Sequence, residues 1–249
     1  MPHPFEIREE IEVTATPEQV WEAVATGPGI DSWFMGRTEV EPGVGGSARM
    51  TLMGFTSEAT VTAWEPGRHF AYNSEGPDGT SMAFDYRIES RDSGRTVVRL
   101  VHSGFLGDDW EAEYDALRKG DPVYLLKLAA YLAGFPNRVA ECSVFTPGPQ
   151  VADAGLLWAA LGVGDPAGPD PVTAGTRVRL AVDGLDAEEG EVVFAHAPNA
   201  VGVRVGDALC TFSHGHQGMV VIEHHDFAKD AEEERIARAW QSWLDRSFA

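Results

Sequence analysis

His102 is the residue of the first half whose type and position could support chemistry. Pairing residues 81–90 with 95–103 through the turn at Ser93-Gly94 places aromatic side chains on the same face as this histidine. A histidine in such surroundings can anchor a ligand hydroxyl or carboxylate, or act as a general acid or base. The alternative is a core histidine that donates to a backbone carbonyl.

A helix that begins near Trp110 is expected to lie on this face and to enclose an apolar space. Small-molecule sites have such apolar walls with a few polar anchors. The alternative is that the same side chains simply fill the core. The predicted ligand-binding set has one titratable group, and consists of Trp33, Phe34, Met50, Leu52, Tyr72, Phe84, Tyr86, Leu100, His102, Trp110, Tyr114 and Leu117.

Cys210, His214 and His224 are the corresponding candidates of the second half, and all three residue types can bind zinc. However, Cys210 and His214 are four residues apart on a predicted strand, roughly 13 Å, which is too far for one ion. No combination of Ser, Cys, His and Asp has the local context of a nucleophilic site. The sequence therefore predicts no metal, no cofactor and no catalytic residue.

The elements that must position these residues occur twice along the chain. Residues 11–119 match residues 142–248 in order, and the last strands align His102 with His224. A period of this length indicates duplication of a domain, because solenoid repeats are much shorter. We predict two domains, residues 1–138 and residues 139–249. Each comprises a strand, a short helix, an antiparallel run and a long terminal helix.

The helix signals are the most specific local features. Thr16 is the expected N-cap of the first helix, and Asp108 that of the long helix. We expect residues 120–122 to interrupt the long helix, and the second half to end in one unbroken helix over about 230–248. The second half has no counterpart of Trp33 and Phe34, so we expect its cavity to be closed and its role to be structural.

Composition excludes several classes of function. The formal net charge of −20 is divided evenly between residues 1–138 and 139–249. Such a field repels phosphate backbones and anionic lipid, so neither nucleic acid nor membrane is an expected partner. Two cysteines, no signal-peptide pattern and no apolar run of membrane-spanning length predict a cytoplasmic protein.

Residues 15–26 and 30–34 resemble the START-like helix-grip superfamily (SRPBCC), in particular its branch similar to the activator of the heat-shock-protein-90 ATPase. Residues 102–105, 110–114 and 122–126 resemble the last strand and gripping helix of that branch. The resemblance covers residues 5–135 and extends to 139–249 through the repeat. It implies an α+β fold in which a curved antiparallel sheet wraps around a long C-terminal helix, here as a tandem repeat. In relatives the intervening cavity holds lipids, hormones or polyketides.

Three functions compete on these grounds. The leading hypothesis is non-enzymatic binding of a small apolar or aromatic molecule in the cavity of the first domain. The second is a protein-interaction module such as a chaperone regulator, which the resemblance suggests. The third is an enzyme similar to polyketide cyclases or hydrolases, with His102 as acid or base and Tyr86 or Tyr114 as hydrogen-bond donor.

Overall fold

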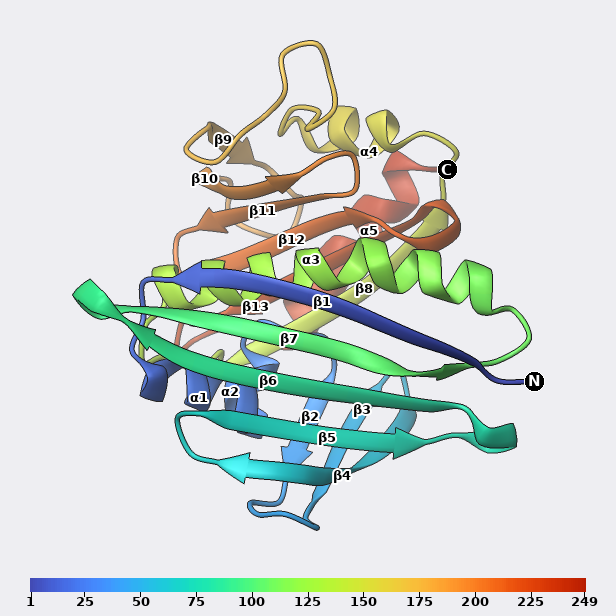
Figure 1. The fold of residues 1–249 in the computed structure, drawn as a ribbon. Helices are drawn as coiled ribbons and strands as arrows, with labels where there is room; N and C mark the ends of the chain where they lie inside the picture. The colour runs from blue at the N-terminus through green and yellow to red at the C-terminus, as the bar shows by residue number, and fades with distance from the viewer. The chain divides into compact units, whose positions relative to one another are not determined.

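The computed structural model describes residues 1–249, with the exception of the side chain of Ser93. The chain divides into two compact units, Met1–Val139 and Ala140–Ala249 (Figure 1). The strands of the first unit are β1 (His3–Val13), β2 (Arg37–Val40), β3 (Ser47–Leu52), β4 (Phe55–Glu65), β5 (His69–Glu75), β6 (Ser81–Arg91) and β7 (Arg95–Leu106). Its helices are α1 (Pro17–Ala25), α2 (Gly27–Asp31) and α3 (Trp110–Gly134).

The first unit is one antiparallel sheet of seven strands, in the order β1-β7-β6-β5-β4-β3-β2. The first strand pairs with the last, and consecutive strands from β2 onward are neighbours. β2 and β3 cross the direction of β5 and β6 in Figure 1, as expected for a strongly twisted and curved sheet. α3 follows the last strand and packs against β1 and β7.

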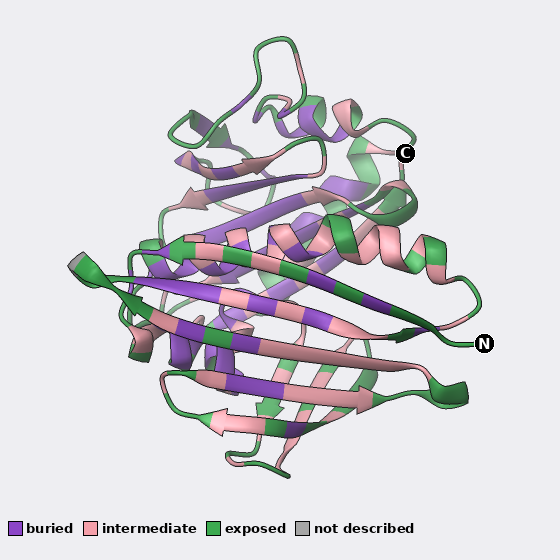
Figure 2. Ribbon diagram, in the orientation of Figure 1, coloured by how far each residue is buried: buried purple, intermediate pink, exposed green. Residues whose placement is uncertain are grey.

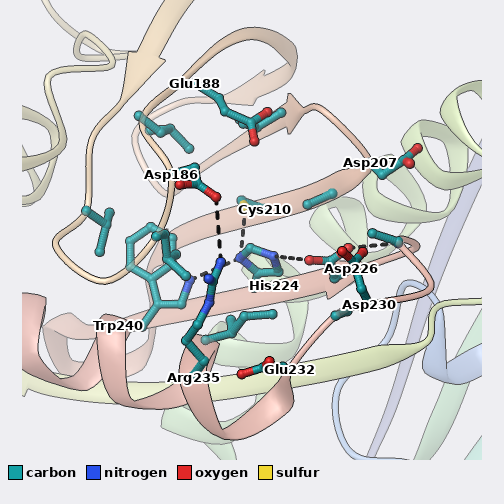
Figure 3. Close-up of a pocket in the computed structure, with 18 residues that line it drawn as sticks. Asp186, Glu188, Asp207, Cys210, His224, Asp226, Asp230, Glu232, Arg235 and Trp240 are labelled. Atoms are coloured by element: carbon teal, nitrogen blue, oxygen red, sulfur yellow. Dashed lines mark hydrogen bonds and ion pairs between the residues drawn. The ribbon is translucent and has the colours of Figure 1, made fainter.

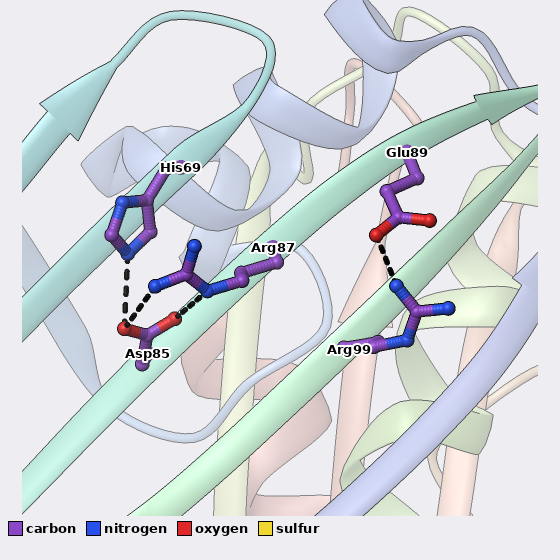
Figure 4. Close-up of polar contacts among 5 residues, drawn as sticks. All are labelled: His69, Asp85, Arg87, Glu89 and Arg99. Atoms are coloured by element: carbon purple, nitrogen blue, oxygen red, sulfur yellow. Dashed lines mark hydrogen bonds and ion pairs between the residues drawn. The ribbon is translucent and has the colours of Figure 1, made fainter.

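The two faces of this sheet differ because side chains alternate along each strand. The outer face of β6 and its neighbours carries charged groups, as Figure 4 shows. There, Asp85 lies 3.0 Å from His69 Nε2 and 3.2 Å from Arg87 Nε, and Arg99 contacts Glu89. The residues between them on β6 turn to the inner face, where the apolar core lies.

The helix boundaries follow capping chemistry at α1 but not at α3. Thr16 caps α1 in a reciprocal capping box with Gln19, as predicted. The prediction for α3 was wrong in two respects. Its N-cap is Asp109, without a side-chain cap, and the helix continues through Pro122 without a break. Packing of α3 on the sheet compensates for the backbone hydrogen bond that the proline removes.

The second unit repeats this plan with a sheet of six strands, in the order β8-β13-β12-β11-β10-β9. Again the first strand pairs with the last, and a helix follows it. The strands are β8 (Cys142–Gln150), β9 (Arg177–Leu180), β10 (Glu188–His196), β11 (Ala200–Val205), β12 (Ala208–His214) and β13 (Met219–Asp226). The helices are α4 (Ala154–Leu161) and α5 (Glu233–Ser247).

α5 is one unbroken helix, as predicted, and its apolar side chains recur at helical spacing. Ile236, Trp240 and Leu244 are all buried in the core of the second unit. Figure 2 shows buried residues continuing along β12, whereas buried and exposed residues alternate along β1. The predicted tandem helix-grip fold is therefore present. Within the part of the chain that the structure describes, no helix has the length and apolarity needed to cross a membrane.

Candidate functional site

The inner face of the first sheet carries a row of side chains that crosses five strands. Ile7, His102, Phe84, Tyr72 and Val61 are successive cross-strand partners on β1, β7, β6, β5 and β4. The Phe84 ring stacks on His102 with centroids 4.0 Å apart and on Tyr72 with centroids 5.2 Å apart. Phe84 and Tyr72 keep part of their surface exposed. The row therefore combines aromatic surface with one titratable ring.

His102 is held by a carboxylate from α3. Its Nδ1 lies 3.0 Å from Oδ2 of Asp121, and the side chains are 3% and 0% exposed. A buried carboxylate is costly unless it is paired, and Asp121 obtains its partner from the last strand of the sheet. The pair therefore links α3 to β7 and fixes the plane of the imidazole.

The pair also determines where the proton of His102 lies. An ionised carboxylate only accepts hydrogen bonds, so Nδ1 donates and the Nε2 of the neutral ring keeps a lone pair. Nε2 is buried and has no hydrogen-bond partner among the residues that the structure describes. Such an unsatisfied buried atom is rare, and a ligand that donates a hydrogen bond would satisfy it.

Two tyrosines belong to the same face, and the hydroxyl of Tyr86 is near enough to Asp121 to be affected by its charge. Burial raises the pKa of Tyr86 well above its ordinary value, and Tyr72, Asp121 and Tyr124 raise it further. Burial likewise raises the pKa of Tyr72. Both tyrosines therefore stay protonated near neutral pH and are hydrogen-bond donors beside a histidine that can accept.

A second charged side chain of α3 is also fully buried. Lys127 is 0% exposed, and its Nζ lies 5.6 Å from the ring centroid of Phe34 and 5.4 Å from that of Tyr124. Those two rings are 4.8 Å apart and partly exposed. Cation–π contacts of this kind offset part of the cost of burying an ammonium group. Lys127 thus adds a positive charge to the inner face of the unit.

The structure brings together some of the predicted site residues and separates others. Tyr72, Phe84, Tyr86 and His102 join through ring contacts, directly or through Phe70. Leu100 is buried beside Tyr86, its cross-strand partner.

The remaining predicted residues lie on three other elements. Phe34 contacts Trp33, which is buried, and Tyr124. Met50 and Leu52 lie on β3, separated from β5 by β4. The early α3 residues pack on Phe5, Ile7 and Leu106, and this cluster borders the row because Phe5 meets His102 edge to face; the α3 residues are Trp110, Tyr114 and Leu117.

Asp121 and Lys127 are the site residues that sequence reasoning missed. Asp121 lies in the stretch 120–122 where the sequence predicts a helix break that does not exist. The sequence contains a signal for both residues. Asp121 lies one helical turn from Leu117 and from Leu125, and Lys127 lies about one turn from Tyr124 and from Tyr131. A charged residue on the apolar stripe of a helix indicates a buried partner.

The second unit has a pocket where we expected a closed interior. A pocket of about 380 Å³ lies between the sheet and the first turns of α5 (Figure 3). The expectation was wrong because it considered only the lost aromatic side chains. A small residue stands at the decisive position, because Cys210 on β12 is opposite His224 where Phe84 on β6 is opposite His102. A small side chain leaves room that a phenyl ring fills.

His224 is the inward-facing histidine of this pocket. Its Nδ1 lies 3.4 Å from the Sγ of Cys210 and accepts a hydrogen bond from Trp240 Nε1 at 3.1 Å. Its Nε2 lies 3.6 Å from Oδ2 of Asp226. Across the described residues, no group of three or more His, Cys, Asp or Glu side chains is arranged to hold a metal ion. The pocket therefore combines a thiol, an imidazole and a carboxylate without a metal-binding arrangement.

Comparisons with known proteins concern mainly the first unit. Residues 4–133 match the family described as polyketide cyclase/dehydrase and lipid transport. Protein MLL2253 from Mesorhizobium loti is 21% identical, with a TM-score of 0.47 over 53% of this chain and 98% of its own. The Aha1 dimer from Colwellia psychrerythraea is 24% identical, with a TM-score of 0.42 over 51% of this chain and 96% of its own.

Some of the similar solved structures span both units. The di-domain ARO/CYC protein BexL from the BE-7585A biosynthetic pathway is 13% identical, with a TM-score of 0.47 over 98% of this chain and 94% of its own. No curated protein sequence matches the chain. The functional conclusion therefore depends on the family match and on the geometry of the site.

Proposed function

The chain belongs to the polyketide cyclase/dehydrase and lipid transport family, within the START-like helix-grip (SRPBCC) superfamily, and on this premise we propose that its first unit binds a small hydroxylated aromatic molecule. The site is the inner face of the sheet beside α3. One observation carries the proposal, namely the buried and unpaired Nε2 of His102 next to partly exposed aromatic rings.

The rings supply the apolar part of the site. Phe84 and Tyr72 stack on each other, and Phe34 and Tyr124 meet edge to face. All four keep accessible surface although they belong to the inner side of the unit. A flat aromatic ligand would bury this surface, and aromatic contacts of this kind add about 0.5–1.5 kcal/mol per ring pair beyond area burial.

The histidine supplies the polar anchor. Asp121 fixes Nδ1 as the donor, so Nε2 can accept a hydrogen bond from a ligand hydroxyl. Binding without chemical transformation needs only this acceptor and the rings. The ligand class that we propose is therefore a phenol or a hydroxylated polycyclic compound.

A pair of probes tests the anchor, 1-naphthol and naphthalene, which differ by one hydroxyl group. Calorimetry with the full-length chain should show tighter binding of 1-naphthol, by about threefold to tenfold, the value of one net hydrogen bond. His102→Ala should abolish this difference, and Phe84→Ala should weaken the binding of both probes. Equal affinity of the unchanged protein for the two probes would contradict the proposal.

His69→Gln is the matched control for His102→Ala. His69 is also a strand histidine paired with an aspartate, but it lies on the outer face of the same sheet (Figure 4). The variant should leave both affinities unchanged. A weakening equal to that of His102→Ala would mean that the effect comes from loss of stability and not from the inner face.

Acid–base catalysis is a second candidate, because the same geometry suits proton abstraction. A histidine whose Nδ1–H is held by a carboxylate can take a proton at Nε2, and Tyr86 can donate to a developing oxyanion. Deuterium incorporation into the methyl group of acetophenone, followed by NMR in D₂O, tests this activity. A rate of exchange that depends on His102 would support an enzyme. A rate equal to that in buffer without protein would leave ligand binding as the only supported function. Regulation of a chaperone stays a prediction.

A further inference from the structure

The pocket of the second unit places a histidine between a thiol and a carboxylate. Cys210 and His224 are directly opposed cross-strand partners on β12 and β13, and Asp226 follows two residues later on the same face. The Sγ of Cys210 lies 3.4 Å from His224 Nδ1, and Asp226 Oδ2 lies 3.6 Å from Nε2 (Figure 3). Nucleophile, base and orienting acid therefore occur in the order that an activated nucleophile requires.

The protonation of this histidine can respond to its neighbours. An indole N–H only donates, so its bond to Nδ1 favours the neutral ring beside a thiol. Burial lowers the pKa of His224, but the Cys210 sulfur and the Asp226 carboxylate raise it by more, to about 10. Trp240 thus favours the neutral ring of His224, whereas the Cys210 sulfur and the Asp226 carboxylate favour the protonated ring.

The side chains at the mouth of the pocket are mostly acidic and favour cationic ligands over anionic ones. Among the lining residues that the structure describes, Arg235 is the single basic side chain, and it lies 3.8 Å from Asp186. Negative rims concentrate cations and repel anions. The acidic lining residues are Asp186, Glu188, Asp207, Asp226, Asp230 and Glu232.

A buried polar atom points to a ligand independently of the rim. The Nε2 of His224 lies 3.6 Å from Asp226 Oδ2, beyond hydrogen-bond distance, so it has an ion-pair neighbour but no hydrogen-bond partner among the described residues, and its side chain is 9% exposed. The inner wall is otherwise apolar, with Ile236 and Trp240 from α5 opposite the strands. The pocket therefore suits a small molecule with a cationic group at the mouth and a reactive group at Cys210.

We propose that this pocket is a second site, that it binds small cationic disulfides, and that Cys210 exchanges with them while His224 carries the proton. Thiol–disulfide exchange requires a thiolate and an acid for the leaving thiolate. It needs no oxyanion stabilisation. In this pocket Cys210 supplies the thiolate and His224 supplies the acid.

The exchange balances without another oxidant. His224 Nδ1 takes the proton of the Cys210 thiol, and the sulfur attacks one sulfur of the bound disulfide. A new S–S bond forms as the old one breaks, and the leaving thiolate takes the proton back from Nδ1. The ligand loses one thiol, and Cys210 becomes half of a mixed disulfide.

Two thiosulfonate probes of opposite charge test the site, the 2-(trimethylammonium)ethyl and the 2-sulfonatoethyl methanethiosulfonates. Each transfers its thioalkyl group to a thiolate and releases methanesulfinate. Mass spectrometry of the intact, folded full-length chain should show Cys210 reacting about tenfold faster with the cationic probe, after each rate is divided by that of the same probe with free 2-mercaptoethanol. No reaction at Cys210, or equal corrected rates with the two probes, would overturn the proposal.

Cys142 is the internal control, because it is as buried as Cys210 but lies on β8 opposite Asp226, outside the pocket lining as described. It should react only after denaturation. His224→Gln should slow the reaction of Cys210 by about a hundredfold, the scale of a lost general base. An unchanged rate would overturn the role of His224.

Reaction of Cys142 without denaturant would reveal that His224→Gln fails to fold. In that case two further variants keep the test decisive. Asp230→Asn removes a rim charge and should reduce the preference for the cationic probe. Asp170→Asn removes the same charge from an exposed position outside the pocket lining, and should leave the preference unchanged. Equal effects of these two variants would overturn the selection by the rim.

Discussion

His102 and His224 occupy matching positions in the two units, yet they are opposites in their chemistry. Each lies on the strand that comes last in the sequence of its unit, and its Nδ1 faces a residue of the long helix that follows. In the first unit that residue is Asp121, which accepts a hydrogen bond. In the second it is Trp240, which donates one. The same scaffold position thus meets a hydrogen-bond acceptor in one unit and a hydrogen-bond donor in the other.

The cross-strand residues opposite the two histidines also differ between the units. Phe84 stacks on His102 and fills the space beside it, whereas Cys210 is small and contacts His224 through sulfur. One unit therefore presents an aromatic surface with a hydrogen-bond acceptor. The other presents a pocket with a thiol. The helix residue that each histidine meets and the residue opposite it are thus two positions at which the units that we compare differ.

Removal of the Asp121 carboxylate should have the largest effect on this comparison. Asp121→Ala leaves the Nδ1–H of His102 buried without an acceptor, and loss of one partner of a buried pair costs about 3–5 kcal/mol. Urea denaturation should show this decrease in the free energy of unfolding. Asp115→Ala, at a half-exposed position of the same helix, should change it by less than about 0.5 kcal/mol. A loss of similar size in both variants would refute a special role for the pair.

Removal of the Trp240 donor should cost less, because the Nδ1 of His224 keeps the Cys210 thiol as a partner. We expect Trp240→Phe to lower the free energy of unfolding by about 1 kcal/mol more than Trp243→Phe, the net value of one hydrogen bond. Both tryptophans are buried in the same core, so they lose similar packing. Identical losses, measured by urea denaturation, would show that the indole N–H contributes nothing.

The response to acid should be the smallest effect, with opposite signs in the two units. Burial raises the pKa of Asp226, but the neighbouring His224 and a hydrogen bond from the Ala228 amide lower it to below the ordinary 3.8. Its contribution to stability is therefore present above about pH 4 and is lost as the pH falls through its folded-state pKa. Burial raises the pKa of Asp31 despite its bond from the Thr38 amide, so stability is gained there on acidification.

Unfolding free energies at pH 7 and pH 3 check these signs. Asp226→Asn should make the loss of stability on acidification smaller, because it removes a group that loses its stabilising charge. Asp31→Asn should make the loss larger, because it removes a group whose protonation is favoured by folding. The same direction of change in both variants would contradict the contrast between the two carboxylates.

The elements could be predicted well from local patterns. The alternation along β6 and β7 predicts the inner face that carries Phe84 and His102. The helical spacing of Ile236, Trp240 and Leu244 predicts the buried face of α5. The cap of α1 at Thr16 was also predicted, because capping depends on residues within one turn. Each of these signals arises from neighbours in the chain.

The partners of the functional side chains could not be predicted in the same way. Asp121 follows a glycine and precedes a proline, so its local sequence indicates a helix break, and only packing on the sheet keeps α3 continuous. The pocket of the second unit was missed because the absence of aromatic residues suggested collapse. Its volume depends on how Cys210 and its neighbours fit against α5.

The sequence by itself determined a duplicated α+β plan and the positions of two inward-facing histidines, because strand and helix periods are local properties of the chain. The tertiary structure alone decided which atom each histidine meets. That choice depends on the helix turn that docks over the last strand, 19 residues after His102 and 16 residues after His224. Hydrogen-bond donors and acceptors act over about 3 Å, so proton placement follows from docking and not from periodicity.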